Sequence, residues 1–579
     1  MPPVPKTILS IPIPKLRSSG SLSFGSDATP TPCRIRFIDC RAFVEDDALK
    51  IVEFEEFPFR IIDGFQEVSY VAISYVWKGK EGDEEGGSFV VRYGGSQDCT
   101  EDDTGDPISI SVLHSVCLAV LKDSSLLDFS INYVWLDRLC IMQTNKEDKS
   151  WQIRRMFEVY ENSVVTIILP GGIQRLVGLN EETDWLQRAW TLQESLAPPN
   201  KVVLHRWEGD ESNLWIKPIQ SSGPGSRGYA LTPLDYLVEA CVEGKLTWEA
   251  GLDQTLDESR KQRRVLDDVK IIGLKGSPNL HAFLEALKST HPNSSSLPGF
   301  GDYAIWKNAL IRTSKRPVDM VFSIMKLFDV ELNPIAYDEN DRIGATIDLA
   351  REILSRPGRR GVASWIGVAT RAPPCRQLST FPEFPRTSVA GKALIKGVNA
   401  GTFVDEDILI APGSGNIYST EEYMIEGRID EAGYLHFWGE GCAVTEVTST
   451  PPIEIPGCAE CFNHTTQHLS LKSVDGREWY FHGGVDLSHE VPKAAAIPAV
   501  AFKTFYGLPH DPGPITSFSK WMLVEEHATG KSHLTSYFRI PSGIGEELTW
   551  EEKEVLRIKE RKVKFRFCVG GPDPDVPYN

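Results

Sequence analysis

The amino-acid sequence predicts an α/β domain with a mainly parallel sheet and flanking helices, followed by a helical segment and a β-rich C-terminal region. Three observations lead to this fold class. Between Cys33 and Trp207, short apolar runs alternate with amphipathic stretches, as in a sheet that helices cover on both faces. Residues 301–356 show helical periodicity. From about residue 390 onward, short strand-like runs are separated by turn residues.

The elements of the first domain are predicted from its hydrophobic pattern. The apolar runs that predict strands are YVAISYVW (70–77), YVWLD (133–137), VVTIILP (164–170) and KVVLHRW (201–207). Amphipathic stretches predict helices at residues 107–128, 151–163 and 185–197. The polar residues 138–150 lie between the second strand and the second helix, and we expect them to form a mobile loop.

The length of 579 residues exceeds that of one ordinary domain. Residues 1–32 are rich in Pro and Ser, and we expect them to form a flexible N-terminal tail. The further segments that we predict are the α/β domain at 33–207, a polar linker or insertion with helices at 208–300, a helical region at 301–390 and the β-rich region at 391–579.

Composition excludes several classes of protein. The chain carries 61 Lys and Arg against 80 Asp and Glu, a net charge of −19, so it lacks the basic surface of a general nucleic-acid binder. No apolar run approaches the roughly 20 residues that cross a bilayer, and the N-terminus has no signal-peptide core. The 11 scattered cysteines suit reduced thiols. We therefore expect a cytoplasmic protein with no membrane segment.

The predicted helix 185–197 carries two distinct faces. Trp185, Ala189, Leu192 and Leu196 fall on one stripe with the spacing of a buried face. Trp190 and Glu194 lie one turn apart on nearly the opposite side. Two interpretations remain open for that second face. Either Trp190 and Glu194 line a ligand site, or Glu194 pairs with a nearby Arg while Trp190 packs against another part of the chain.

Candidate ligand-binding residues gather at one edge of the predicted sheet. In open parallel sheets, ligands bind outside the carboxyl ends of the strands. Ser74 and Tyr75 end the first predicted strand, and Asp137 and Arg138 end the second. We expect the carboxylate of Glu194 to reach a solvent-accessible hollow at the same edge. Beside the indole of Trp190 it would be partly desolvated, which raises the pKa of a carboxyl group and suits it to catalysis.

Three sequence blocks resemble one family. YVAISYVW, then YVWLDRLCIMQ followed by Gln152, Met156 and Tyr160, and finally RAWTLQE (188–194) are similar to the fungal heterokaryon-incompatibility (HET) domain, over about residues 68–207. Two departures stand out: Lys78 follows Trp77 where the family usually has glycine, and the segment 78–106 is long and acidic. The resemblance implies a role in non-self recognition that triggers cell death when incompatible cells fuse, with an unknown incompatibility partner.

The resemblance extends to Toll/interleukin-receptor (TIR) domains, to which HET domains are considered distantly related. In TIR enzymes, a glutamate in a Trp-Cys-Leu-x-Glu motif cleaves the nicotinamide–ribose bond of NAD. The matching residues here are Trp190-Thr191-Leu192-Gln193-Glu194, which makes Glu194 the implied catalytic residue. NAD is then a substrate, and no other cofactor is implied.

The same resemblance implies the surroundings of the site. It places Trp190, Ser74, Tyr75, Asp137 and Arg138 around the substrate, and it implies a homo-oligomer. Asp137 either contacts the ribose or caps the turn that follows it. The alternative for the whole domain is a non-catalytic interaction module that signals by self-assembly.

One cluster in the C-terminal region contains metal-ligand types. Cys458, Cys461, His464 and His468 lie within eleven residues. Zinc sites usually take two ligands from each of two separated elements, and this cluster is more compact than that. We therefore assign no metal site, while a zinc-dependent C-terminal domain remains an alternative.

Overall fold

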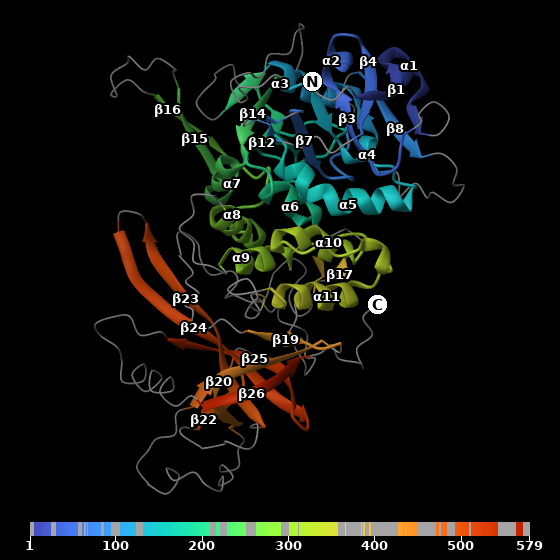
Figure 1. Ribbon diagram of the computed structural model, residues 1–579. Helices are drawn as coiled ribbons and strands as arrows, with labels where there is room; N and C mark the ends of the chain where they lie inside the picture. Colours follow the sequence, from blue (N-terminus) through green and yellow to red (C-terminus); the bar gives the residue numbers. More distant parts are fainter. Residues whose placement is uncertain are drawn as a thin grey trace, which may run out of the picture. The chain divides into compact units, whose positions relative to one another are not determined.

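The computed structural model shows two compact units, and each is described here by itself (Figure 1). Unit 1 comprises residues 1–287, 322–327 and 331–338, and unit 2 comprises residues 288–321, 328–330 and 339–579. The residues that the structure describes are 5–24, 30–55, 61–62, 65–66, 68–82, 86–93, 105–122, 131–208, 216–219, 228–250, 262–290, 300–310, 312–356, 365, 384, 386–387, 393–394, 426–431, 433–447, 470–473, 476–482, 493–508, 511–541 and 563–570.

The described part of unit 1 is built on a mixed sheet of nine strands. In spatial order these are β1 (Lys6–Pro12), β4 (Ala48–Phe54), β3 (Ile35–Asp39), β10 (Tyr133–Trp135), β7 (Tyr70–Tyr75), β11 (Val165–Leu169), β12 (Lys201–Arg206), β14 (Tyr229–Pro233) and β13 (Lys217–Ile219). The predicted strands β7, β10, β11 and β12 are confirmed and run parallel to their neighbours among themselves.

The sheet as a whole is mixed, so the prediction of a mainly parallel sheet holds for its centre and not for its flanks. On one side β10 pairs with β3, β3 with β4 and β4 with β1, all antiparallel. On the other side β12, β14 and β13 also pair antiparallel. The parallel centre is covered on both faces and therefore reads as continuous apolar runs, whereas the antiparallel flanks add shorter strands with mixed patterns. The segment 208–300 thus contributes strands to the sheet as well as helices.

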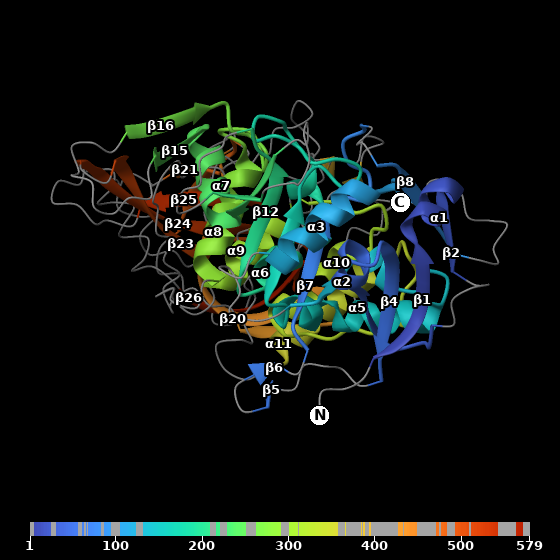
Figure 2. The ribbon, with the colours of Figure 1, turned by 90° about the horizontal axis from the view of Figure 1, so that it is seen from above.

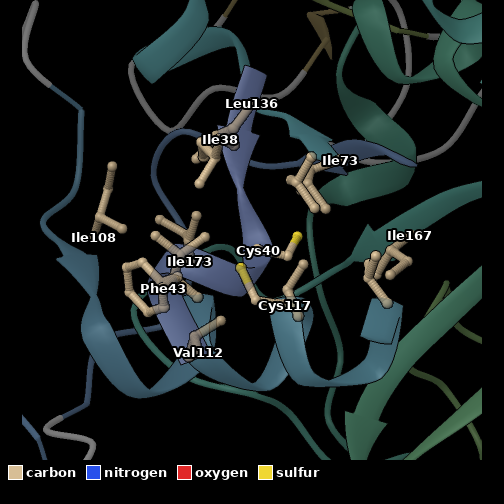
Figure 3. Packing of buried hydrophobic residues seen from close by; sticks show 14 of the residues in the cluster. Ile38, Cys40, Phe43, Ile73, Ile108, Val112, Cys117, Leu136, Ile167 and Ile173 are labelled. Carbon is tan, nitrogen blue, oxygen red and sulfur yellow. The ribbon is translucent and has the colours of Figure 1, made fainter. Parts of the chain in front are cut away.

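Helices cover both faces of this sheet. Val71, Ile73 and Tyr75 of β7 belong to the same apolar cluster as α3 (Ile110–Lys122), which lies across the strands in Figure 2. Figure 3 shows Val112 and Cys117 of α3 in this cluster with Ile73 and Ile167. Tyr70 and Ala72 belong instead to the cluster that contains α5 (Lys146–Glu161). Alternate residues of β7 therefore point to opposite helical layers, as strand geometry requires.

The N-terminal segment is part of the fold, and the prediction of a flexible tail is wrong for residues 6–24. After β1 come α1 (Ile13–Ser19) and β2 (Ser21–Phe24). β1 pairs with β4, and β2 pairs with β8 (Ser88–Tyr93), which also pairs with β9 (Ile108–Ser109). The buried apolar side chains of this segment are Ile8, Leu9, Ile13, Leu16 and Leu22. Its prolines sit where structure tolerates them, at the end of β1 and in the first turn of α1.

Further elements complete unit 1. They are α2 (Cys40–Val44), β5 (Ile61–Ile62), β6 (Phe65–Gln66), α4 (Asp137–Cys140), the 3₁₀ turn η2 (Trp185–Gln187), α6 (Trp190–Leu196), α7 (Leu234–Glu243), the hairpin β15 (Lys245–Ala250) and β16 (Gln262–Asp267), and α8 (Pro278–Thr290), which ends in unit 2. α10 (Asp319–Met325) and η4 (Lys326–Phe328) each have residues in both units, and η5 (Pro334–Ala336) belongs to unit 1.

Unit 2 combines helices with the expected β-rich region. Its helices include α9 (Phe300–Ala309) and α11 (Arg342–Leu354). The described strands of its main sheet are β19 (Gly427–Ile429), β20 (Tyr434–Glu446), β21 (Ser470–Lys472), β22 (Glu478–Phe481), β23 (Ala494–Leu508), β24 (Asp511–Ala528), β25 (Lys531–Pro541) and β26 (Val563–Gly570). The pairings run from β20 through β23, β24, β25 and β26 back to β20, so the sheet closes on itself. No helix in the described ranges has the length and apolar character needed to span a bilayer.

Candidate functional site

The strand order of the sheet reverses at β7. Among the parallel strands, β7 is the first in the chain. The next of them, β10, pairs with one side of β7, and β11 pairs with the other side. Such a reversal marks the place where open α/β sheets bind ligands, outside the carboxyl ends of the strands. Ser74 and Tyr75 are the last residues of β7, and Asp137 follows β10 by two positions. These residues therefore lie at the carboxyl edge of the parallel strands, where the sequence placed them.

Ser74 and Glu194 are in direct contact at this edge. The Ser74 hydroxyl donates a hydrogen bond of 2.6 Å to Glu194 Oε2, and the indole Nε1 of Trp185 donates one of 2.8 Å to Ser74 Oγ. A strand, a 3₁₀ turn and the helix α6 thus supply an indole–hydroxyl–carboxylate chain. This short hydrogen bond holds the carboxyl group of Glu194 in a defined position.

The environment of Glu194 differs from the expected one. The predicted helix 185–197 is divided into η2 and α6, and its core stripe is confirmed at Trp185, Ala189 and Leu192, which are all buried. Glu194 is only 7% exposed, instead of reaching a solvent-accessible hollow. Trp190 packs, partly buried, against the apolar cluster of α5 rather than opening a cleft. The opposite side of α6 is buried because the helix packs between β7 and α5.

Tyr160 of α5 lies within electrostatic reach of the carboxylates. Its hydroxyl donates a hydrogen bond of 2.9 Å to the backbone carbonyl of Ile73. Burial raises the pKa of Tyr160 well above its usual value, the negative charges of Glu194 and Asp137 raise it further, and Arg188 opposes them. Tyr160 therefore stays a neutral phenol at the edge. Tyr160 belongs to the second family block, which indicates its position but not its role.

A second polar group surrounds Asp137. Its carboxylate accepts hydrogen bonds from Tyr75 Oη at 2.7 Å, from Trp77 Nε1 at 2.8 Å and from the backbone N–H of Arg138 at 2.6 Å. Ser74 and Tyr75 are successive strand residues and point to opposite faces. The structure therefore joins Ser74 to Glu194 and Tyr75 to Asp137, but it does not unite the four side chains in one group. The bond from Arg138 lies within the turn, and those from Tyr75 and Trp77 tie the carboxylate to the end of β7. A contact between Asp137 and a ribose stays a prediction.

Two arginines, Arg138 and Arg188, donate hydrogen bonds to backbone carbonyls at this edge. Arg138, a predicted substrate residue, is 1% exposed, donates to the backbone carbonyl of Asp106 and lies 6.0 Å from the ring centroid of Trp77. Arg188 was not among the predicted residues. It donates to the carbonyl of Tyr75 at the end of β7. Arg188 is the first residue of the third family block, and this position could have identified it as a candidate site residue.

Residues 138–150 do not form an open loop, so this prediction is wrong. α4 covers their beginning, and α5 starts at Lys146, capped by Asn145, whose side chain accepts from the backbone N–H of Asp148. The fully buried carboxylate of Asp148 binds Arg36 of β3 at 3.0 Å and the backbone N–H groups of Cys33 and Met142. These bonds tie the start of α5 to the sheet.

A close backbone contact requires glycine one residue after the departure from the family pattern at Lys78. Lys78 follows Trp77, and glycine comes one residue later, at position 79. A Cβ atom on Gly79 would lie 2.1 Å from the carbonyl oxygen of Gly171, and the N–H of Lys80 donates to that same oxygen at 2.7 Å. The segments that follow β7 and β11 thus approach each other backbone to backbone, which fixes the rim of the candidate site.

Metal binding finds no support in the described part of the chain. Among these residues, no group of three or more His, Cys, Asp or Glu side chains could hold a metal ion. Cys458, Cys461, His464 and His468 lie outside the described residues. The absence of an assigned metal site at that cluster therefore stays a prediction.

Comparison with known proteins gives one match. Residues 70–180 match the family model described as Heterokaryon incompatibility protein (HET). No curated protein and no solved structure matches the chain significantly. The matched range contains Ser74, Tyr75, Asp137 and Arg138 and ends before Glu194, so the assignment of Glu194 depends on the resemblance of the RAWTLQE block. A HET domain suggests a role in heterokaryon incompatibility. Residues 70–180 of the chain are therefore similar to a HET domain.

Proposed function

We propose that this protein is a non-self-recognition effector of heterokaryon incompatibility and that it cleaves the nicotinamide–ribose bond of NAD with Glu194. The observation that carries the proposal is the 2.6 Å contact between Ser74 and Glu194 at the carboxyl end of β7, where the strand order reverses. The TIR-like order of elements and the Trp190–Glu194 spacing support the same reaction.

The reaction requires little from the protein beyond one well-placed carboxylate. The bond between the ribose C1′ and the nicotinamide nitrogen breaks, and its electron pair leaves with the nitrogen. The nicotinamide is then neutral and needs no proton. The ribose passes through an oxocarbenium-like state, whose positive charge Glu194 stabilises, and water adds to C1′. In the low dielectric of a buried site this charge stabilisation is stronger than in water.

Ser74 has a positioning role in this proposal. Its hydroxyl, itself bonded to Trp185, fixes one carboxylate oxygen of Glu194. Glu194 is 7% exposed, so a ribose can reach it only after the groups that cover α6 are displaced. We assign that displacement to self-association, triggered by an incompatibility partner. Loss of cytoplasmic NAD then leads to cell death.

The burial of Glu194 also favours a second candidate function. In this second candidate, the buried carboxylate bonded to Ser74 holds α6 on β7 and takes part in no reaction. In that case the HET domain acts as a non-catalytic interaction module and signals by assembly. The two candidates differ in whether nicotinamide is produced.

The test measures nicotinamide release from NAD by the purified full chain, as monomer and after concentration or crowding. The parent is compared with Glu194→Gln and with Glu158→Gln as matched control. Glu158 undergoes the same chemical change, and its ion pair with Arg155 lies on the surface of α5. We expect Glu194→Gln to lower the rate by about a hundredfold or more, the usual cost of removing a charge-stabilising group. Glu158→Gln should match the parent.

Two outcomes would overturn the catalytic proposal. Equal release by the parent and Glu194→Gln would remove Glu194 from the reaction. If neither the monomer nor any assembled form of the parent released nicotinamide, the interaction module would remain.

A further inference from the structure

One face of the C-terminal sheet presents a group of titratable side chains that the proposed function does not use. Along β20, Leu435 and Phe437 are buried, and Tyr434 and His436 point to the opposite face. β26 pairs antiparallel with β20 and places Cys568 directly opposite His436. Cys568 and His436 therefore share the outer face of the sheet, where both are partly exposed.

The thiol, the imidazole and a carboxylate are in contact. Cys568 Sγ lies 3.8 Å from His436 Nε2, and the same nitrogen lies 2.9 Å from Asp430 Oδ2. Asp430 precedes the tight turn between β19 and β20, and its carboxylate also accepts from the backbone N–H of Tyr434 at 2.9 Å. The carboxylate is thus fixed beside the imidazole and holds its ring in place.

The neighbouring strands add basic groups to this face. Lys531 of β25 lies 4.7 Å from the ring centroid of Tyr434, and Tyr434 Oη lies 3.1 Å from Nε2 of His527 on β24. The ring of His533 lies with its centroid 3.5 Å from that of His527. Lys531 thus brings a positive charge to this face beside the neutral phenol of Tyr434, whereas burial lowers the pKa of His527. A nearby cation favours the thiolate form of a cysteine.

We propose that Cys568 is a modification site, a thiol that His436 activates for two-electron oxidation by a small peroxide. In nucleophile–base–acid triads the imidazole contacts the nucleophile and the carboxylate through different nitrogens. Here both contacts converge on Nε2, which suits an imidazolium that stabilises a thiolate rather than a relay for acyl transfer. A small neutral oxidant can reach the partly exposed sulfur.

The oxidation step balances as follows. In the proposed step the thiol proton is transferred to His436, so that the reacting pair is thiolate and imidazolium. The thiolate sulfur attacks one oxygen of hydrogen peroxide, an S–O bond forms, and the O–O bond breaks. The electron pair leaves with the second oxygen, which takes the proton from His436 and becomes water. Sulfur is oxidised by two electrons to the sulfenic acid, and the peroxide is reduced.

Cys33 is the internal control for this proposal. It is also partly exposed, but burial and the carboxylates of Glu147 and Asp148 raise the pKa of its thiol. Cys442 on β20 is buried and reports on folding, because it reacts only when the sheet opens. One sample therefore reports the reactivity of Cys568 relative to Cys33, and Cys442 reports whether the C-terminal sheet is folded.

The experiment treats the full chain with hydrogen peroxide at pH 6.5, traps sulfenic acid with dimedone and quantifies each cysteine-containing peptide by mass spectrometry. A parallel series measures iodoacetamide alkylation between pH 5.5 and 9. Lowering a thiol pKa from about 8.5 to about 7 raises its thiolate fraction at pH 6.5 by more than tenfold. We therefore expect about tenfold more label on Cys568 than on Cys33, and a tenfold loss at Cys568 alone in His436→Gln.

Similar labelling and pH profiles for Cys568 and Cys33 in the parent would overturn the proposal. So would unchanged Cys568 labelling in a folded His436→Gln variant. If that variant exposes Cys442, the comparison moves to Asp430→Asn, in which the imidazolium loses its carboxylate and Cys568 labelling should fall. The parent profile decides the proposal even if both variants unfold.

Discussion

At the scale of single residues, His205 shows how burial alone sets the charge of a side chain. It lies on β12 with no exposed surface, and its ring nitrogens contact the carbonyl of Arg206 at 3.0 Å and the Thr232 hydroxyl at 2.9 Å. Desolvation lowers the pKa of His205 to about 4. The neutral ring satisfies both contacts by donating to the carbonyl and accepting from the hydroxyl, so it has a structural role.

This burial predicts an acid-sensitive fold. Between the unfolded pKa of about 6.5 and the folded pKa of about 4, the unfolded chain binds more protons than the folded one. The free energy of unfolding of unit 1 should therefore fall by about 3 kcal/mol from this residue as the pH drops from 6.5 to 4. His205→Gln should lose that component, as measured by urea unfolding at several pH values. His114→Gln should change the pH dependence less, because that side chain is partly exposed to solvent. An identical pH dependence for parent and His205→Gln would contradict the prediction.

The candidate site shows what sequence can and cannot give at this scale. From helical and strand periodicity we predicted that Ser74 and Glu194 lie at the same edge of the sheet. In the structure the two side chains are in contact. The alternation of strand residues also separates Tyr75 from Ser74, and the sequence contained that information. The burial of Glu194 could not be read from the sequence, because it depends on how α6 packs against β7 and α5.

At the scale of elements, the beginning of α5 depends on a partner far away in sequence. Arg36 on β3 and Asp148 on α5 form an ion pair of 3.0 Å between side chains that are 1% and 0% exposed. Local polarity suggests a loop for residues 146–150, because Lys, Glu and Asp dominate there. The buried pair compensates that polarity across more than 100 residues of chain. Periodicity does not contain such a contact, and the same reason explains why the pairing of β1 with β4 was missed.

The ion pair makes a quantitative prediction for the stability of unit 1. Asp148→Asn removes the negative charge and leaves the guanidinium of Arg36 buried. Among the described residues, its remaining acidic partner is Glu53, 3.8 Å from Nε. Breaking a buried pair costs about 3–5 kcal/mol, and we expect about 3 kcal/mol here because Glu53 remains. The measurement is urea unfolding followed by tryptophan fluorescence.

Glu158→Gln is the matched control for this change. Its pair with Arg155 lies on the surface of the same helix, with side chains 29% and 45% exposed, and its loss should cost under about 0.5 kcal/mol. If Asp148→Asn were no more destabilising than Glu158→Gln, the beginning of α5 would not depend on the buried pair.

At the scale of the whole molecule, unit 1 is not a continuous stretch of chain. It takes residues 1–287 and then 322–327 and 331–338, while residues 288–321 and 328–330 belong to unit 2. The sequence predicted the secondary structure of the helical region 301–356 but not this division. A hydrophobic pattern predicts that a helix has an apolar face, but it does not predict which unit covers that face.

The returning segment should stabilise unit 1, which two fragments can test. Within unit 1, η5 packs against α5, and the rings of Phe322 and Tyr337 meet edge to face at 5.8 Å. Lys326 lowers the pKa of Glu331, and Arg154 and Arg155 of α5 lower it further. A fragment of residues 1–287 lacks all of these contacts, whereas a fragment of residues 1–338 retains them.

We expect the shorter fragment to unfold at a lower temperature, by roughly 2–4 °C for each kcal/mol of packing that it loses. Circular dichroism gives the midpoints, and limited proteolysis should cut α5 first in the shorter fragment, because the partner of its outer face is missing. Adding back residues 322–338 as a peptide should raise the midpoint of the 1–287 fragment in a concentration-dependent manner. Equal midpoints for the two fragments, together with no effect of the peptide, would show that unit 1 is complete at residue 287 and that the later segment only rests on it.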